Sequence, residues 1–154
     1  MRTIVVGLGN PILRDDGVGV HVVRAAARQV QRDDIVFAEA SIGGLRLLDL
    51  LAGYERAILV DAIVTPDGRP GEIRRLGPTD LRCSRHAGSS HDVSLPAALA
   101  LGRRMGMALP PDERISIIAI EAVDVLTFGE DCTPEVAAAI PRAVEVLLEE
   151  LGDG

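Results

Sequence analysis

The sequence has few aromatic residues, few cysteines and a deficit of positive charge. Aromatic side chains make up only 2% of the 154 residues, so a core has to be built from valine, isoleucine, leucine and alanine. That choice of residues is typical of helices packed on a parallel sheet. The formal net charge of -7 argues against a nucleic-acid-binding domain and against binding to an anionic membrane surface, because both need basic faces.

Long apolar runs are also missing. No stretch approaches the roughly 20 apolar residues that span a bilayer, and the short apolar N-terminus continues into a glycine turn, unlike a signal peptide. The two cysteines, Cys83 and Cys132, are far apart and lack metal-ligand spacing, so we expect free thiols. These features predict a cytoplasmic protein that does not act on a membrane.

The chain is long enough for one domain, residues 1–154, and its 47% hydrophobic content fills one core. Helical and strand-like segments alternate along most of it, which predicts an α/β fold: a three-layer sandwich, with a twisted, mostly parallel sheet and helices on both faces. Residues 77–91 are expected to form a long irregular loop, and such loops tend to be functional. Strands are expected at 2–7, 34–40, 56–63, 114–121 and, at an edge, 71–76; helices are expected at 17–30, 43–53, 92–105 and from Thr133 onward, with Pro141 kinking or splitting the last.

The stretch G-L-G-N-P-I after the first strand begins like a dinucleotide-binding fingerprint, but Ile12 stands where the third glycine belongs. Asp15 and Asp16 follow at the start of the next helix, where they would repel a phosphate. The helix dipole favours carboxylates at that place, so the simplest alternative is that Asp16 only caps the helix.

Further polar residues fall near the carboxyl ends of the expected strands or at the start of a helix. Ligands bind at the carboxyl ends of strands in open α/β sheets, so Asp16, Asp61 and His91 are candidate ligands of a divalent metal such as nickel or zinc. Glu121 ends the last strand and points toward the same edge in this interpretation. Two alternatives remain open: Asp61 bonds a loop backbone, or His91 lies on the surface. No serine or cysteine with a histidine partner suggests nucleophilic catalysis.

Three motifs resemble those of the hydrogenase maturation endopeptidases. They are the opening G-L-G-N-P-I-L-R-D-D-G-V-G-V, the L-V-D-A-I around Asp61, and S-S-H-D-V-S-L, in which His91 opens a helix. The stretch S-I-G-G-L-R-L-L is similar to the family's glycine-bearing loop. Many members carry glutamate where this chain has the shorter Asp16. The resemblance spans nearly the whole chain.

This resemblance implies an endopeptidase that removes the C-terminal extension of the nickel–iron hydrogenase large-subunit precursor after nickel insertion. The metal-contacting residues of the family carry over to Asp16, Asp61 and His91, which we also expect to be the catalytic residues. Nickel is then the cofactor that the substrate precursor carries, and the precursor is the partner. Gly43, Gly44 and Glu121 are candidates for binding the extension. We expect a monomer.

Three other functions are compatible with parts of the sequence. A metallochaperone-like module would use the same three residues to hold nickel without protease activity. Peptidyl-tRNA hydrolases also begin with G-L-G-N-P, but their histidine–asparagine pair is absent because Val22 follows His21. A flavodoxin-like nucleotide-binding domain is disfavoured by the missing glycine and the two aspartates.

Overall fold

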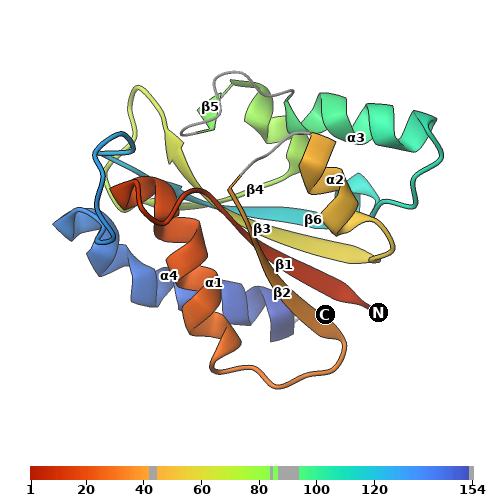
Figure 1. The fold of residues 1–154 in the computed structure, drawn as a ribbon, viewed down its shortest axis with the longest axis horizontal. Coiled ribbons are helices and arrows are strands. Elements are labelled where there is room, and N and C mark those ends of the chain that lie inside the picture. Colours follow the sequence, from red (N-terminus) through yellow and green to blue (C-terminus); the bar gives the residue numbers. More distant parts are fainter. Residues whose placement is uncertain (42–44, 84, 87–93, 153–154) are drawn as a thin grey trace.

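The computed structural model describes residues 1–41, 45–83, 85–86 and 94–152, and a twisted sheet runs through its centre (Figure 1). The strand order is β2-β1-β3-β6-β4, and the first four of these strands are parallel. Strand β4 pairs with β6 in the antiparallel direction at the edge of the sheet, where the sequence predicted a weak strand. The bounds are β1 Thr3–Leu8, β2 Ile35–Ala40, β3 Arg56–Val64, β4 Ile73–Leu76 and β6 Ile115–Glu121.

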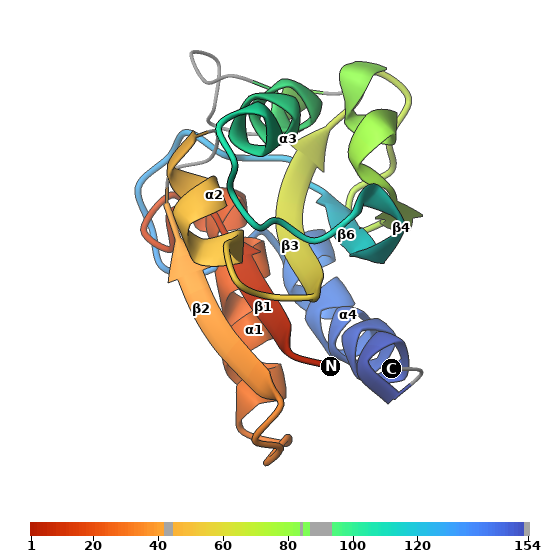
Figure 2. The ribbon, with the colours of Figure 1, turned by 90° about the vertical axis from the view of Figure 1, so that its right-hand side faces the viewer.

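Helices cover both faces of the sheet, as the sequence predicted (Figure 2). Side chains alternate along a strand, so Ile58 and Val60 of β3 join the core under α1 and α4, whereas Leu59 and Ile63 join the core under α2 and α3. The aliphatic residues expected from the composition fill both cores. The helices are α1 Val18–Ala27, α2 Leu45–Leu51, α3 Leu95–Arg104 and α4 Pro134–Gly152.

The region expected to be irregular, 77–91, contains regular structure in its described part. A short 3₁₀ helix spans Pro78–Cys83, and strand β5, Arg85–His86, pairs with the end of β3. That pairing is possible because β3 extends beyond β1, whose partners stop at Val60 of β3. The expectation of a loop was wrong here because a two-residue strand leaves no periodic pattern.

The helix ends follow their capping residues. The Ser94 hydroxyl of the α3 N-cap accepts a hydrogen bond from the amide of Ala97, at 3.4 Å, with Pro96 in the first turn. Helix α4 is not split at Pro141, contrary to one expectation; both Pro141 and Ala137 are exposed, so water can bond the carbonyl that proline leaves unpaired. No helix in the described part of the chain is long and apolar enough to cross a membrane.

The winding of the chain gives the sheet a switch point between β1 and β3. From β1 the chain passes through α1 to β2 on one side, and then through α2 to β3 on the other side of β1. The connection after β1 leads to β2 at one edge of the sheet, whereas the connection after β3 leads to β4 at the opposite edge, so the two connections diverge. Ligands of open α/β sheets bind at such a switch point, outside the carboxyl ends of the strands.

Candidate functional site

Glycines allow the first turn of α1 to lie directly on the ends of β1 and β3. A side chain at Gly19 would collide with the carbonyl oxygen of Val60, and one at Gly9 would collide with the carbonyl oxygen of Asp16. Gly9 also has a φ of 126°, a conformation that residues with side chains rarely adopt. This close packing places Asp16 beside the end of β3, where Asp61 directly follows Val60.

Asp16 is buried, with 5% of its surface exposed, in a short 3₁₀ helix at Arg14–Gly17. Its Oδ2 accepts a hydrogen bond from the backbone amide of Asn10 at 2.8 Å. Its Oδ1 is buried and has no hydrogen-bond partner among the described residues. The N-cap of α1 is Gly17, without a side-chain bond, so Asp16 does not cap this helix.

The pKa of Asp16 is raised from 3.8 to about 6. Burial is the largest cause, because it removes water from the charged form; the negative charge of Asp61 raises the pKa further. The hydrogen bond from Asn10 acts in the opposite direction but does not compensate. A cation bound between these two carboxylates would stabilise their charged forms.

Asp61 lies within β3 and is 3% exposed. Its Oδ1 accepts a hydrogen bond from the adjacent amide of Ala62 at 2.8 Å. Asp61 therefore bonds the backbone of its own strand, whereas the alternative from the sequence was a bond to a loop backbone. The electrostatic effect of Asp61 on Asp16 shows that the structure brings these two predicted residues together. They come from positions 45 residues apart in the sequence (61 minus 16).

The third predicted ligand, His91, lies outside the described residues, as do Gly43 and Gly44. Within the described ranges, no group of three His, Cys, Asp or Glu residues has the arrangement of a metal site. The described chain does place the flank of His91 near β3, because His86 pairs with Ile63, two residues beyond Asp61. The role of His91 stays a prediction.

Glu121 is buried, with 2% of its surface exposed, and both of its carboxylate oxygens contact Thr65. Oε2 accepts from the Thr65 amide at 2.8 Å, and Oε1 accepts from the Thr65 hydroxyl at 2.6 Å. These bonds attach the connection that follows β3 to the end of β6. The observed contacts of Glu121 are therefore structural, and its predicted part in substrate binding stays a prediction.

Asp15 is a residue whose part in the site the sequence did not reveal. It is completely buried, and its Oδ2 accepts hydrogen bonds from the amides of Val123 and Asp124, both at 2.9 Å. Its Oδ1 accepts from the Thr133 amide at 2.7 Å, and the Thr133 hydroxyl also bonds the carboxylate. Asp15 thus fastens the turn that carries Asp16 to the connection between β6 and α4; the only signal in the sequence was its adjacency to Asp16.

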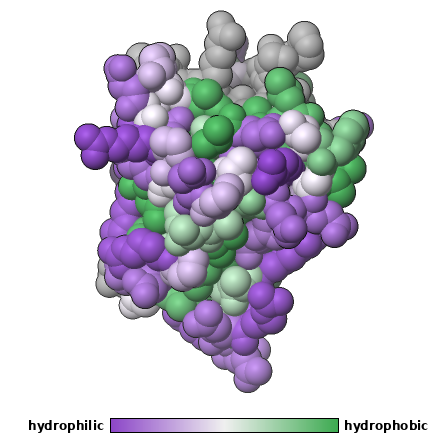
Figure 3. All heavy atoms as spheres, turned by 90° about the vertical axis from the view of Figure 1, so that its left-hand side faces the viewer, coloured by the Kyte–Doolittle hydropathy of each residue, from purple (hydrophilic) through white to green (hydrophobic). Residues whose placement is uncertain are grey.

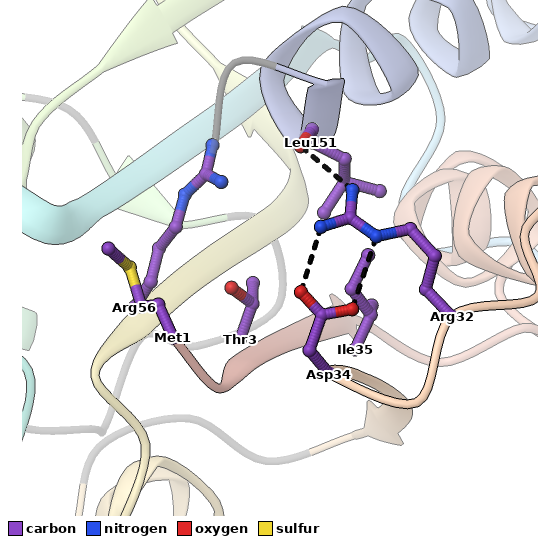
Figure 4. Close-up of a pocket in the computed structure, with 7 residues that line it drawn as sticks. All are labelled: Met1, Thr3, Arg32, Asp34, Ile35, Arg56 and Leu151. Atoms are coloured by element: carbon purple, nitrogen blue, oxygen red, sulfur yellow. Dashed lines mark hydrogen bonds and ion pairs between the residues drawn. The ribbon is translucent and has the colours of Figure 1, made fainter.

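The pocket in Figure 4 lies at the amino ends of the strands, away from Asp16 and Asp61. Its acidic residue, Asp34, forms an ion pair with Arg32 at 2.8 Å, and the hydrogen bond from Arg32 lowers the pKa of Asp34. Arg32 also donates to the carbonyl of Leu151 at 3.3 Å. The pairing leaves this pocket without the free carboxylates that a cation site needs.

A different hollow opens beside the Asp16 turn, between α1 and β2. It is lined by Gly9, Pro11, Val20, Glu39, Ala40 and Ser41. The backbone amide of Gly9 donates to the carbonyl of Ala40 at 2.9 Å, which connects the two walls of the hollow. A chain segment lying here would pass next to the Asp16 turn.

Comparisons with known proteins point to one family. Residues 20–150 match the family model described as hydrogenase maturation protease. The hydrogenase 2 maturation protease of Escherichia coli is 28% identical, with 98% of this chain and 91% of that protein covered. Subunit delta of the coenzyme F420 hydrogenase of Methanothermobacter thermautotrophicus is 28% identical, over 97% of this chain and 94% of that protein.

Solved structures agree with this match. The hydrogenase maturating endopeptidase HybD from Escherichia coli superposes with a TM-score of 0.81 and 28% identity, covering 99% of this chain and 93% of that one. The maturation protease HybD from Thermococcus kodakarensis superposes with a TM-score of 0.67 and 27% identity, covering 97% of this chain and 98% of that one.

Proposed function

The chain belongs to the hydrogenase maturation protease family, and we propose that it is the endopeptidase that removes the C-terminal extension of a nickel–iron hydrogenase large-subunit precursor after nickel insertion. The match to the family over residues 20–150 supports the protease activity. The nickel requirement is what the resemblance to the family implies, and the carboxylates at the switch point are compatible with a divalent cation such as nickel or zinc. In this proposal the enzyme acts as a monomer in the cytoplasm.

The observation that carries the proposal is the pair formed by Asp16 and Asp61. Two buried carboxylates lie close enough to raise the pKa of Asp16, and the Oδ1 of Asp16 has no partner among the described residues. Such an arrangement is unfavourable without a cation. We propose that the nickel of the precursor is that cation.

His91 is the third nickel-contacting residue in this proposal. The chain between His86, which is paired with Ile63, and His91 is five residues long (91 minus 86) and can extend up to about 17 Å. His91 is therefore within reach of Asp61. Two carboxylates and an imidazole leave coordination positions for the ligands that the precursor itself provides, and such a mixed set suits nickel.

The metal serves first for recognition, because a precursor that holds nickel brings a cation to the unpartnered Oδ1 of Asp16, beside the negative charge of Asp61. Held there, nickel can also polarise the scissile carbonyl or activate a water molecule, as metals do in hydrolysis. We propose that the extension lies in the hollow beside Gly9 and Ser41 and continues to Gly43 and Gly44. Glu121 supports the neighbouring connection through Thr65.

The direct experiment incubates the protein with the large-subunit precursor, with and without inserted nickel, and follows release of the C-terminal peptide by mass spectrometry. We expect release from the loaded form alone. A metallochaperone-like module would instead bind free nickel tightly and leave the loaded precursor intact. Absence of cleavage with a cognate loaded precursor would remove the protease assignment.

A further inference from the structure

Four large apolar side chains are exposed on two segments beside the Asp16 turn. They are Ile12, Val123, Leu126 and Phe128, exposed by 47%, 53%, 82% and 79%; together we name them the apolar ridge. The two segments are neighbours, because the amide of Gly129 donates to the carbonyl of Ile12 at 2.8 Å and Leu13 forms a bridge with Gly129. Figure 3 shows the face of the molecule that carries these segments, where apolar and strongly polar side chains lie next to each other.

Hydrogen bonds fix the backbone of the apolar ridge. The Oδ1 of Asp124 accepts from the amides of Leu126 at 3.1 Å and Thr127 at 2.9 Å. On the other side of Phe128, the carbonyl of Gly129 accepts from the amide of Arg14 at 2.9 Å. The exposed side chains therefore project from a preformed connection, and a preformed surface loses little conformational freedom when a partner binds.

The apolar ridge is continuous with the candidate site. Asp15 accepts hydrogen bonds from Val123 and Asp124, and it precedes Asp16 in the chain. The amide of Asp16 in turn donates to the carbonyl of Leu13, at 3.0 Å, next to Ile12. A protein that contacts the ridge therefore lies beside the turn that carries Asp16.

Acidic residues predominate on the connection that carries most of the apolar ridge. The connection between β6 and α4 contains Asp124, Glu130 and Asp131 but no lysine or arginine. Arg14 is near, and its guanidinium lies 3.9 Å from the carboxylate of Asp124. Glu130 and Asp131 are exposed, so a partner with basic residues around an apolar centre would complement this surface.

We propose that the apolar ridge is the docking surface for the folded body of the large-subunit precursor, which it holds so that the nickel and the extension reach Asp16 and Asp61. This inference rests on the proposed function. The docked surface is apolar at its centre, with basic residues at its rim. A second copy of the chain fits less well, because a symmetric contact would bring the acidic rims together.

The test is a double substitution, Leu126→Ser with Phe128→Ser, assayed with the nickel-loaded precursor. We expect KM to rise by about tenfold or more, as for truncation of central interface residues, while kcat at saturation and the thermal midpoint of unfolding stay near those of the unsubstituted protein. The single variant Phe128→Ala should show a smaller rise. The matched control is Met105→Ser at the end of α3, which is 71% exposed and should leave KM unchanged.

The outcomes separate the two proposals. If the unsubstituted protein does not cleave the loaded precursor, the proposed function fails first. If it cleaves and the double variant keeps the same KM, the docking surface is wrong. An unchanged KM together with a shift from dimer to monomer in sedimentation would identify the ridge as a contact between copies, and would overturn the proposal. If added salt raises KM for the unsubstituted protein, that result supports basic residues at the rim of the docked surface of the precursor.

Discussion

Asp15 and Asp16 are adjacent in the sequence, yet their carboxylates lie in opposite environments. Both oxygens of Asp15 accept hydrogen bonds from Thr133 or from the amides of Val123 and Asp124. In Asp16 one oxygen accepts from Asn10, and the other has no partner in the described part of the chain. Asp15 thus holds the turn in place, whereas Asp16 keeps one oxygen that can accept a further interaction.

The first prediction concerns the stability cost of Asp16. Its folded pKa of about 6 lies above the ordinary 3.8, so the folded protein binds a proton more readily than the unfolded chain does. The free energy of unfolding should therefore rise as the pH falls from about 6 to about 4. Above pH 6 the carboxylate of Asp16 is charged, and its full destabilising effect is present. We expect Asp16→Asn to raise the free energy of unfolding at pH 7 by on the order of 1–3 kcal/mol, measured by denaturant titration from pH 4 to 8.

In the same variant, cleavage of the loaded precursor should fall by about a hundredfold or more, because an amide replaces the charged group that we propose contacts the metal. Asp16→Glu is the matched control. It keeps a carboxylate at this position, one methylene farther from the backbone, and should retain more activity than Asp16→Asn. Equal activity in the two variants would show that the charge at this position is not used.

The second prediction links Asp61 to Asp16. Removing the negative charge in Asp61→Asn should lower the pKa of Asp16, because that charge is one of the causes that raise it. The shift can be followed by NMR titration of the Asp16 carboxyl carbon. Cleavage should fall as strongly as in Asp16→Asn. An unchanged Asp16 titration would contradict the proximity of the two groups.

The third prediction tests Asp15 as the residue that positions the turn. Asp15→Asn puts amide hydrogens where the carboxylate accepts hydrogen bonds from several backbone amides. The free energy of unfolding should therefore fall by about 1–3 kcal/mol. Activity at a temperature where the variant is folded should fall through kcat. Thr133→Val removes only the hydroxyl and keeps the amide donor, so it should cost less. Full kcat in folded Asp15→Asn would show that this residue only stabilises the fold.

The fourth prediction concerns the contact of α1 with β3. In Gly19→Ala the added methyl group meets the carbonyl of Val60, which cannot move without disturbing the sheet. We expect a loss of about 2 kcal/mol or more of stability together with loss of cleavage. Gly152→Ala is the control, since nothing lies within 4 Å of a side chain built there. Wild-type stability of Gly19→Ala would contradict the close approach of the helix.

The fifth prediction decides the role of Glu121. Glu121→Gln replaces one of the two oxygens that hold Thr65, so the free energy of unfolding should drop by about 1–3 kcal/mol. If Glu121 acts only through this contact, KM for the loaded precursor stays unchanged at temperatures where the variant is folded. A raised KM would support the part in substrate binding that the sequence suggested.

Much of the fold could be predicted from the sequence because long apolar segments dominate it. Strands such as Arg56–Val64 and helices such as Leu95–Arg104 are continuous and bounded by turn residues. Strand β5 was not predicted, because two residues are too few to show the alternating pattern of a strand. Helix α4 continues past Pro141 because an exposed face lets water replace the lost hydrogen bond, which the sequence does not reveal.

The candidate site was predictable only in part. Asp16 follows the first apolar strand and Asp61 lies near the end of another, and topology then brings such positions to one edge. Asp15 and Asp16 have different roles because their side chains point in different directions from the 3₁₀ turn. The direction of Asp15 follows from its contacts with Val123 and Thr133, which are far away in the chain. No local pattern encodes such contacts.

The switch point between β1 and β3 exists because of the order of the strands in the sheet, whatever side chains lie there. The strand order alone does not decide whether such a place binds an anion or a cation. A few charged residues next to it decide this. In the function that we propose, Ile12 in place of a glycine and the carboxylate of Asp16 change the preference of this place from an anion to a cation, while the aliphatic core stays the same. The chemistry of such a scaffold can therefore change while its architecture stays the same.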